Sequence, residues 1–199
     1  MSHLCAHLVS IIPTLSLILN NGATCHSSST AAFFEAAYAT NAAVPTALAA
    51  ALAPRLAAGN GVVLNISSGD GELAFCGTAL AGAMRSAAGQ TPAQAAAGLS
   101  ALVARVTGAE DGTWSVAGGQ AVYRFSKACL NALTRAMAGE GVFVVAAVCP
   151  GDVDTEMGDS EAERSSVEAA RDILELAERL RIGAVEGGCF FRDGEFIEW

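Results

Sequence analysis

The stretch Val62-Val-Leu-Asn-Ile-Ser-Ser68 is a nearly continuous apolar run that ends in two hydroxyl side chains. A run of this kind, preceded by the turn residues Gly59-Asn-Gly61, is typical of a strand that is buried on both faces of a parallel sheet. In open parallel sheets, ligands bind at the carboxyl ends of the strands. Ser67 and Ser68 therefore stand where a binding site is expected. A serine pair that only satisfies the amides of a turn is the alternative interpretation.

Further apolar runs predict the rest of the same sheet. The predicted strands are residues 15–19, which end at Asn20-Asn-Gly22, residues 142–148 and residues 188–191. Helical patterns cover residues 30–56, 121–138 and 161–180. Because strands alternate with helices, we expect a Rossmann-like α/β fold, with about four parallel strands, right-handed crossovers and flanking helices.

The length of 199 residues suits one domain. We expect this domain to span residues 15–199, after a divergent N-terminal segment of residues 1–14. Residues 84–118 exceed a minimal strand–helix unit. A weak helical pattern begins at Thr91-Pro92 and a loop-like stretch follows it, so we interpret this segment as an insertion packed on the surface.

The composition excludes several classes of protein. A hydrophobic fraction of 52% with only 16% charged residues indicates a folded globular chain. The net charge of −9 argues against a nucleic-acid partner, since phosphate binding needs lysine and arginine. None of the six cysteines forms a Cys-x-x-Cys pair, so we expect reduced thiols, no metal site and a reducing, cytoplasmic location.

Residues 7–19 are apolar, which leaves a targeting role as an alternative. No lysine or arginine precedes them, and no clear small-x-small cleavage site follows. They are also too short and too interrupted by Pro13 to cross a membrane. With no other transmembrane candidate in the sequence, we expect no membrane partner.

The stretch Tyr123-Arg-Phe-Ser-Lys127 places a phenol and an ammonium on one face of a helix. The nearby positive charge would favour the ionised phenol, so we expect the pKa of Tyr123 to fall below its usual value of about 10. Such a tyrosine can exchange a proton with a carbonyl or alcohol oxygen near neutral pH. Taken alone, the pair also fits a half-buried ring beside a solvated amine.

Other polar residues stand at the same expected edge of the sheet. Asn20 closes the first strand, and the run Val148-Cys-Pro-Gly-Asp-Val-Asp-Thr155 leaves a later strand through a Pro-Gly turn. Asn41 lies inside an alanine-rich helix, where asparagine has poor propensity and needs a reason to be present.

In this order, the motifs resemble the short-chain dehydrogenase/reductase family. Asn20-Asn-Gly-Ala23 is similar to the family's Asn-Asn-Ala-Gly strand end, with the last two residues swapped. The resemblance implies that Asn41 holds a water for a proton relay, that Ser68 binds the substrate oxygen and that Tyr123 is the acid/base. It implies catalysis by Asn41, Ser68, Tyr123 and Lys127, and cofactor binding by Asn20, Tyr123, Lys127, Pro150, Gly151, Val153 and Thr155.

The long gap between Ser68 and Tyr123, and the ending Phe190-Phe-Arg-Asp-Gly-Glu-Phe-Ile-Glu-Trp199, resemble the carbonyl reductase branch. In that branch the insertion covers the usual dimer-forming helix. The resemblance implies NADP-dependent reduction of a small ketone, aldehyde or quinone, with NAD as the other possible cofactor. Ser68 would steady the substrate oxygen while Tyr123 protonates it, and Lys127 would tune Tyr123.

One family feature is missing, namely the strand and Gly-rich turn that receive the cofactor pyrophosphate. Gly59-Asn-Gly61 and Gly69-Asp-Gly71 follow the wrong elements to supply it. The match begins at the family's fourth strand, so we expect an N-terminally truncated fold. Three hypotheses follow: a carbonyl reductase, a non-catalytic remnant without dinucleotide binding, and an interaction module of the same family.

The expected edge strand Leu15-Ser-Leu-Ile-Leu19 would expose apolar side chains. Two outcomes are open: residues 3–12 fold over this edge of a monomer, or a second chain pairs with it.

Overall fold

The computed structural model describes residues 14–26, 28–57, 60–108, 112–156, 158, 161–162 and 164–199. Apart from Thr14, the predicted N-terminal segment lies outside the described residues, as does the idea that residues 3–12 cover the first strand. The described chain forms a sheet of five strands in the spatial order in which they occur in the sequence. The strands are β1 (Leu17–Asn20), β2 (Val62–Ile66), β3 (Val144–Cys149), β4 (Phe190–Arg192) and β5 (Glu195–Ile197).

The first four strands run parallel, and β5 returns antiparallel to β4. In the register, Leu17 pairs with Val62 and Val62 with Val144, so the three long strands start level. All five residues of β2 are buried. Its polar residue, Asn65, is satisfied because it accepts a hydrogen bond from Asn20 Nδ2 and donates one to Thr134 Oγ1, each at 2.8 Å.

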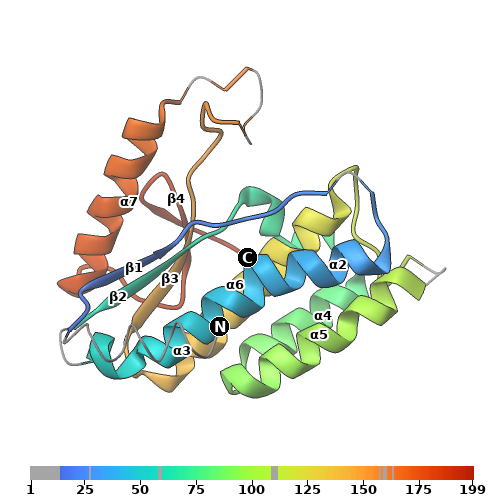
Figure 1. Ribbon diagram of the computed structural model, residues 1–199, viewed down its shortest axis with the longest axis horizontal. Coiled ribbons are helices and arrows are strands. Elements are labelled where there is room, and N and C mark those ends of the chain that lie inside the picture. The colour runs from blue at the N-terminus through green and yellow to red at the C-terminus, as the bar shows by residue number, and fades with distance from the viewer. Residues whose placement is uncertain are drawn as a thin grey trace.

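Helices cover both faces of the sheet (Figure 1). One face carries α3 (Val44–Ala57) and α6 (Ala121–Glu140), with α2 (Ala31–Tyr38), α4 (Thr78–Ala88) and α5 (Pro92–Gly108) packed beyond them. The other face carries α7 (Ser166–Arg181). The π-helical turn η1 (Ala39–Ala43) joins α2 to α3 without a break, and the short 3₁₀ turns η2 (Gly69–Gly71) and η3 (Leu73–Phe75) follow β2.

The prediction of a Rossmann-like fold is confirmed. The four predicted strands are present, with shifts of up to two residues at their ends, and the helix expected from residue 161 begins at Ser166. It begins there because Ser165 and Glu168 form a capping box. The hairpin strand β5 was not predicted; it follows a turn in which Asp193 and Gly194 both have positive φ, +52° and +76°.

The segment expected to be an insertion contains the end of α4, all of α5 and a loop. It takes part in the main core through α5, where Leu99 and Val103 are buried. Helix α4 was missed, although Leu80, Met84 and Ala87 repeat at helical spacing and are buried.

The continuous helix Ala31–Leu56 is long and apolar enough to cross a membrane by length and composition alone. No such segment was expected from the sequence at this place. In the structure, this helix packs Phe34, Leu52 and Leu56 into the interior, as core helices of globular domains do.

Candidate active site

The structure brings Ser68, Tyr123 and Lys127 together at the carboxyl end of β2. The Ser68 hydroxyl lies close enough to the Tyr123 phenol to lower its pKa. The ammonium of Lys127 lies 5.5 Å from the centre of the Tyr123 ring, on the same face of α6. It donates a 2.7 Å hydrogen bond to the carbonyl oxygen of Ile66, the last residue of β2. The predicted grouping of these three side chains is therefore present.

Gly71 allows the turn after Ser68 to approach α6 this closely. A Cβ atom at this position would lie 2.9 Å from Asn131 Nδ2 and 3.0 Å from the backbone carbon of Lys127. The carbonyl oxygen of Gly71 accepts hydrogen bonds from Asn131 Nδ2 at 3.2 Å and from Trp199 Nε1 at 2.9 Å. The turn that carries Ser68 is thus held by both α6 and the last residue of the chain.

The pKa of Tyr123 differs from the prediction. We expected Lys127 to lower it, but burial raises the pKa of Tyr123 to about 12, against a lowering by its hydrogen bond with Ser68. Burial also lowers the pKa of Lys127 to about 8. The expectation failed because residue spacing reveals the neighbour and not the desolvation of both groups. Tyr123 holds its proton at neutral pH, and Lys127 remains largely charged.

Asn41 is buried in η1, and its side chain ties the loop after β1 to α6. Its Oδ1 accepts a hydrogen bond from Thr24 N at 2.8 Å, and its Nδ2 donates to Thr24 O at 2.8 Å and to Ser126 Oγ at 2.9 Å. Both amide hydrogens are therefore used within the protein. A π-helical turn often marks a functional site, and here it places Asn41 opposite Ser126.

Ser126 was not singled out from the sequence. Its hydroxyl is the link between Asn41 and the site, because it also donates a 2.7 Å hydrogen bond to the carbonyl oxygen of Tyr123. The signal was present, since Ser126 lies inside the Tyr123–Lys127 stretch and is fully buried despite its hydroxyl.

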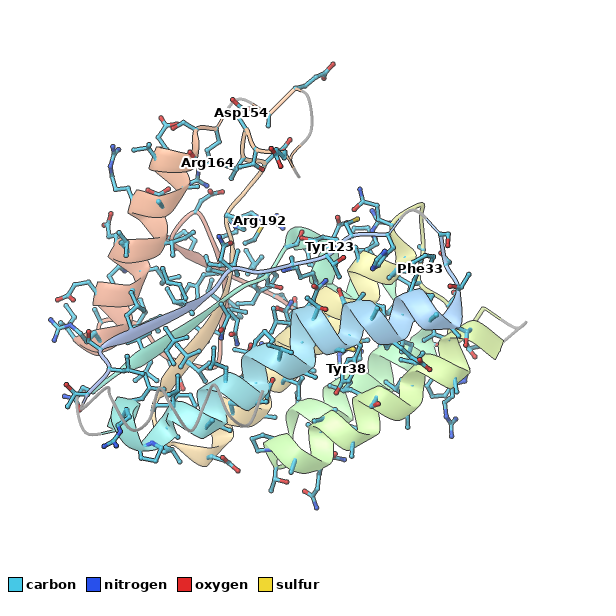
Figure 2. All side chains as sticks on the ribbon, in the orientation of Figure 1. Phe33, Tyr38, Tyr123, Asp154, Arg164 and Arg192 are labelled. Atoms are coloured by element: carbon cyan, nitrogen blue, oxygen red, sulfur yellow. The ribbon has the colours of Figure 1, made fainter. Side chains whose placement is uncertain are left out.

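Asn20, expected to bind cofactor, points its amide along the sheet to Asn65. The segment after β3 also lies apart from the candidate catalytic group of Ser68, Tyr123 and Lys127. Gly151 has a φ of +80°, and Thr155 is exposed, with its hydroxyl donating to the carbonyl oxygen of Val153 at 3.3 Å. Figure 2 shows Asp154, in the same segment, well apart from Tyr123.

Arg164 holds this segment in place. Its Nη1 donates to the carbonyl oxygen of Pro150 at 2.8 Å and to Asp193 Oδ1 at 2.9 Å, and its Nη2 is paired with Asp172. Residues Val153 and Arg164 also form a β-bridge. Pro150 and Val153 are therefore held from the α7 side of the molecule, while the candidate catalytic group lies on α6 and the turn after β2.

Charged residues and a thiol surround the site. Arg124 pairs with Asp70 at 2.7 Å, and Arg192 pairs with Glu72 at 2.7 Å. The sulfur of Cys149 accepts a hydrogen bond from the Gly69 amide at 3.2 Å. Cysteines 25, 76, 129, 149 and 189 are all free thiols. Within the described ranges, no three His, Cys, Asp or Glu side chains are grouped so that they could hold a metal ion.

Solved structures share this architecture. Salutaridine reductase from Papaver somniferum superposes with a TM-score of 0.77 at 21% sequence identity, over 96% of this chain and 77% of that one. The carbonyl reductase Sniffer of D. melanogaster superposes with a TM-score of 0.66 at 20% sequence identity, over 99% of this chain and 72% of that one. An NADPH-bound carbonyl reductase from chicken fatty liver superposes with a TM-score of 0.65 at 22% sequence identity, over 100% of this chain and 70% of that one. A scan against protein-family models and a search of curated proteins gave no match.

The likeness covers nearly all of this chain, which spans 70% to 77% of the length of these three neighbours. Other matching structures are described as short-chain dehydrogenases/reductases. At such low identity the likeness establishes the architecture. The chain has the fold of the short-chain dehydrogenases/reductases.

Proposed function

We propose that this protein is an NAD(P)H-dependent oxidoreductase that reduces the carbonyl group of a small ketone, aldehyde or quinone. The observation that carries the proposal is the grouping of two hydroxyls and one buried ammonium at the carboxyl end of β2. The hydroxyls are those of Ser68 and Tyr123, and the ammonium is that of Lys127. The reductases that share the fold support the same chemistry.

The side chains supply a proton and a place for the developing negative charge. Tyr123, with a pKa of about 12, is protonated at neutral pH and can donate to the substrate oxygen. The Ser68 hydroxyl can donate a second hydrogen bond to that oxygen and stabilise it as charge develops. Lys127 stabilises the phenolate that Tyr123 becomes, because its positive charge lies 5.5 Å from the ring centre.

The residues fit the nicotinamide end of a dinucleotide. Lys127 gives one hydrogen bond to Ile66 O, and an ammonium has three hydrogens to donate, which leaves capacity for a ribose hydroxyl. Ser68 and Tyr123 would then flank the reacting carbon. NADPH or NADH supplies the hydride when bound.

A second candidate function rests on the part of the fold that would receive the pyrophosphate of a dinucleotide. Among the described residues, no strand leads through a Gly-rich turn into a helix; β1 is followed by residues 21–30 and only then by α2. This arrangement favours a protein that keeps the catalytic grouping without binding a dinucleotide and acts as an interaction module of the same family.

Calorimetric titration with NADPH and with NADH separates the two candidates. Saturable binding with micromolar Kd supports the reductase, and the absence of heat at millimolar nucleotide supports the module. With binding present, Tyr123→Phe should abolish reduction of carbonyl compounds and leave nucleotide affinity within about threefold. The matched control is Tyr38→Phe at the chain's other tyrosine, whose hydroxyl donates to Ala96 O away from the site. Retained turnover in Tyr123→Phe would contradict the role of Tyr123.

A further inference from the structure

The open edge of the sheet has properties that the proposed reductase activity does not use. Within the described residues, β1 pairs only with β2, so its outer side is an unpaired edge. Natural edge strands usually carry a charge or a proline that discourages further pairing. The sequence of β1 is Leu-Ile-Leu-Asn, with neither. Among the described residues, this edge therefore carries neither of these protections against another strand.

The backbone groups that face outward can be identified from the pairing with β2. The Ser16 carbonyl accepts from Val62 N at 3.0 Å, so Ser16 directs its groups toward β2. Alternate residues of a parallel strand face the same neighbour. Ile18 therefore also faces β2, and the N–H and C=O groups of Leu17 and Leu19 face away from the sheet.

The side chains next to this edge are apolar on the α7 face. Leu17 packs toward α7, and by strand alternation Leu19 lies on the same face, where it is 42% exposed. Leu174 of α7 is 52% exposed. Leu17 and Leu174 also line a groove of about 250 Å³. The remaining residues of this groove are Ser16, Val62, Ala177, Glu178 and Arg181.

The rim of the groove is electrically balanced, because Glu178 and Arg181 are paired at 2.6 Å. An edge of this kind does not select a strongly charged partner. Two copies of it can meet without like-charge repulsion, although the whole chain carries a net charge of −9.

We propose that the β1 edge is a homodimerisation surface, in which β1 pairs antiparallel with β1 of a second copy about a two-fold axis at Ile18. Leu17 then lies opposite Leu19 of the second copy, and Leu19 opposite its Leu17. Because these are the residues whose backbone groups face outward, the register forms four hydrogen bonds, two at each pair. It also brings four leucine side chains together on the α7 face.

The same register places Ile18 opposite Ile18 of the second copy in a non-hydrogen-bonded pair. The two Cα atoms of such a pair are about 4.5 Å apart, which suits a disulfide. The paired strands are only four residues long, so the interface is small and the dimer forms in a concentration-dependent way. This inference is independent of the proposed catalytic activity.

The first experiment is cross-linking of the full chain with Ile18→Cys under mild oxidation. We expect a disulfide-linked dimer, in which peptide mass mapping identifies the link between the two introduced thiols and distinguishes it from links through native cysteines. The comparison is Phe196→Cys on β5 at the opposite edge, where the side chain is 57% exposed against 9% for Ile18, so random collisions favour cross-linking of the comparison variant. Cross-linking of Ile18→Cys that is no greater than that of Phe196→Cys would overturn the proposal.

The second experiment is sedimentation velocity of the unmodified chain over about 5 to 500 µM, which spans Kd values in the micromolar range. We expect a shift from monomer to dimer and no larger species. Leu19→Lys should remain monomeric with an unchanged circular dichroism spectrum, since residue 19 is already partly exposed, whereas Phe196→Lys should dimerise normally. A wild-type chain that stays monomeric at the highest concentration would reject the second copy as the occupant of this edge.

Discussion

The two edges of the sheet differ in how they are covered. At one edge, β5 folds back on β4, and the final residue, Trp199, is buried with its indole bonded to the Gly71 carbonyl. At the other edge, β1 ends with Leu19 partly exposed beside an apolar groove. The candidate catalytic grouping rests on the closed side, on α6 and the turn that Trp199 holds. Its geometry is therefore set by α6 and this turn, and not by the outer side of β1.

The largest expected contrast is between two leucines. Leu133 of α6 is fully buried in the main core, and Leu174 of α7 is 52% exposed near the open edge. We expect Leu133→Ala to lower the free energy of unfolding by ~2–5 kcal/mol, through lost transfer energy and a residual cavity. Leu174→Ala should change it by no more than ~0.5 kcal/mol. Urea denaturation measures both free energies. Equal losses of stability in the two variants would contradict the contrast between the buried core and the open edge.

The next contrast is in pH dependence, and it concerns Lys127. Its pKa is about 8 in the folded state and 10.5 in the unfolded chain, so between these values the unfolded chain binds more protons and stability rises with pH. We expect the free energy of unfolding of the wild type, relative to that of Lys127→Met, to rise by up to ~3 kcal/mol from about pH 8 to 10.5. Urea denaturation of both proteins across this range tests it. A difference that stays constant or falls with pH would mean that Lys127 is not desolvated.

A smaller contrast compares two asparagines. Asn41→Ala removes three hydrogen bonds and leaves the buried Ser126 hydroxyl with one partner fewer, so we expect a loss of ~2 kcal/mol. Asn20→Ala at the open edge removes one bond, to Asn65, and should cost ~1 kcal/mol. Hydrogen exchange of the Thr24 amide should accelerate in Asn41→Ala and not in Asn20→Ala. The reverse order would show that the loop after β1 is held from the β1 side.

The parallel part of the fold could be predicted because its strands are apolar runs bounded by turn residues. Residues 62–66 were placed without error for this reason. Strand β5 has only three residues, two of them exposed, and carries too short a pattern to be recognised. Helix α4 is rich in alanine and glycine, which weakens the contrast between its buried and exposed faces.

The residues of the candidate site could be predicted from the sequence, whereas the pKa of Tyr123 and the contacts of Asn41 could not. Ser68, Tyr123 and Lys127 were identified from the order of their motifs, and the structure groups them. The direction of the Tyr123 pKa shift was wrong, because burial of the ring depends on neighbours far along the chain. The partners of Asn41 lie 17 and 85 residues away, and no local pattern encodes such contacts.

The π-helical turn η1 has a consequence for the spacing of residues along this helix. A π-turn is one residue wider than an α-turn, so it accommodates an inserted residue without rotating the helix on either side. In this chain the turn spans Ala39–Ala43 and joins α2 to α3. Deleting the exposed Thr40 would restore a regular pitch and leave Phe34 and Leu52 facing the interior, while Asn41 would lose its position opposite Ser126. We expect this deletion to preserve the packing of the helix and to disturb the candidate site, because Asn41 lies within the π-turn.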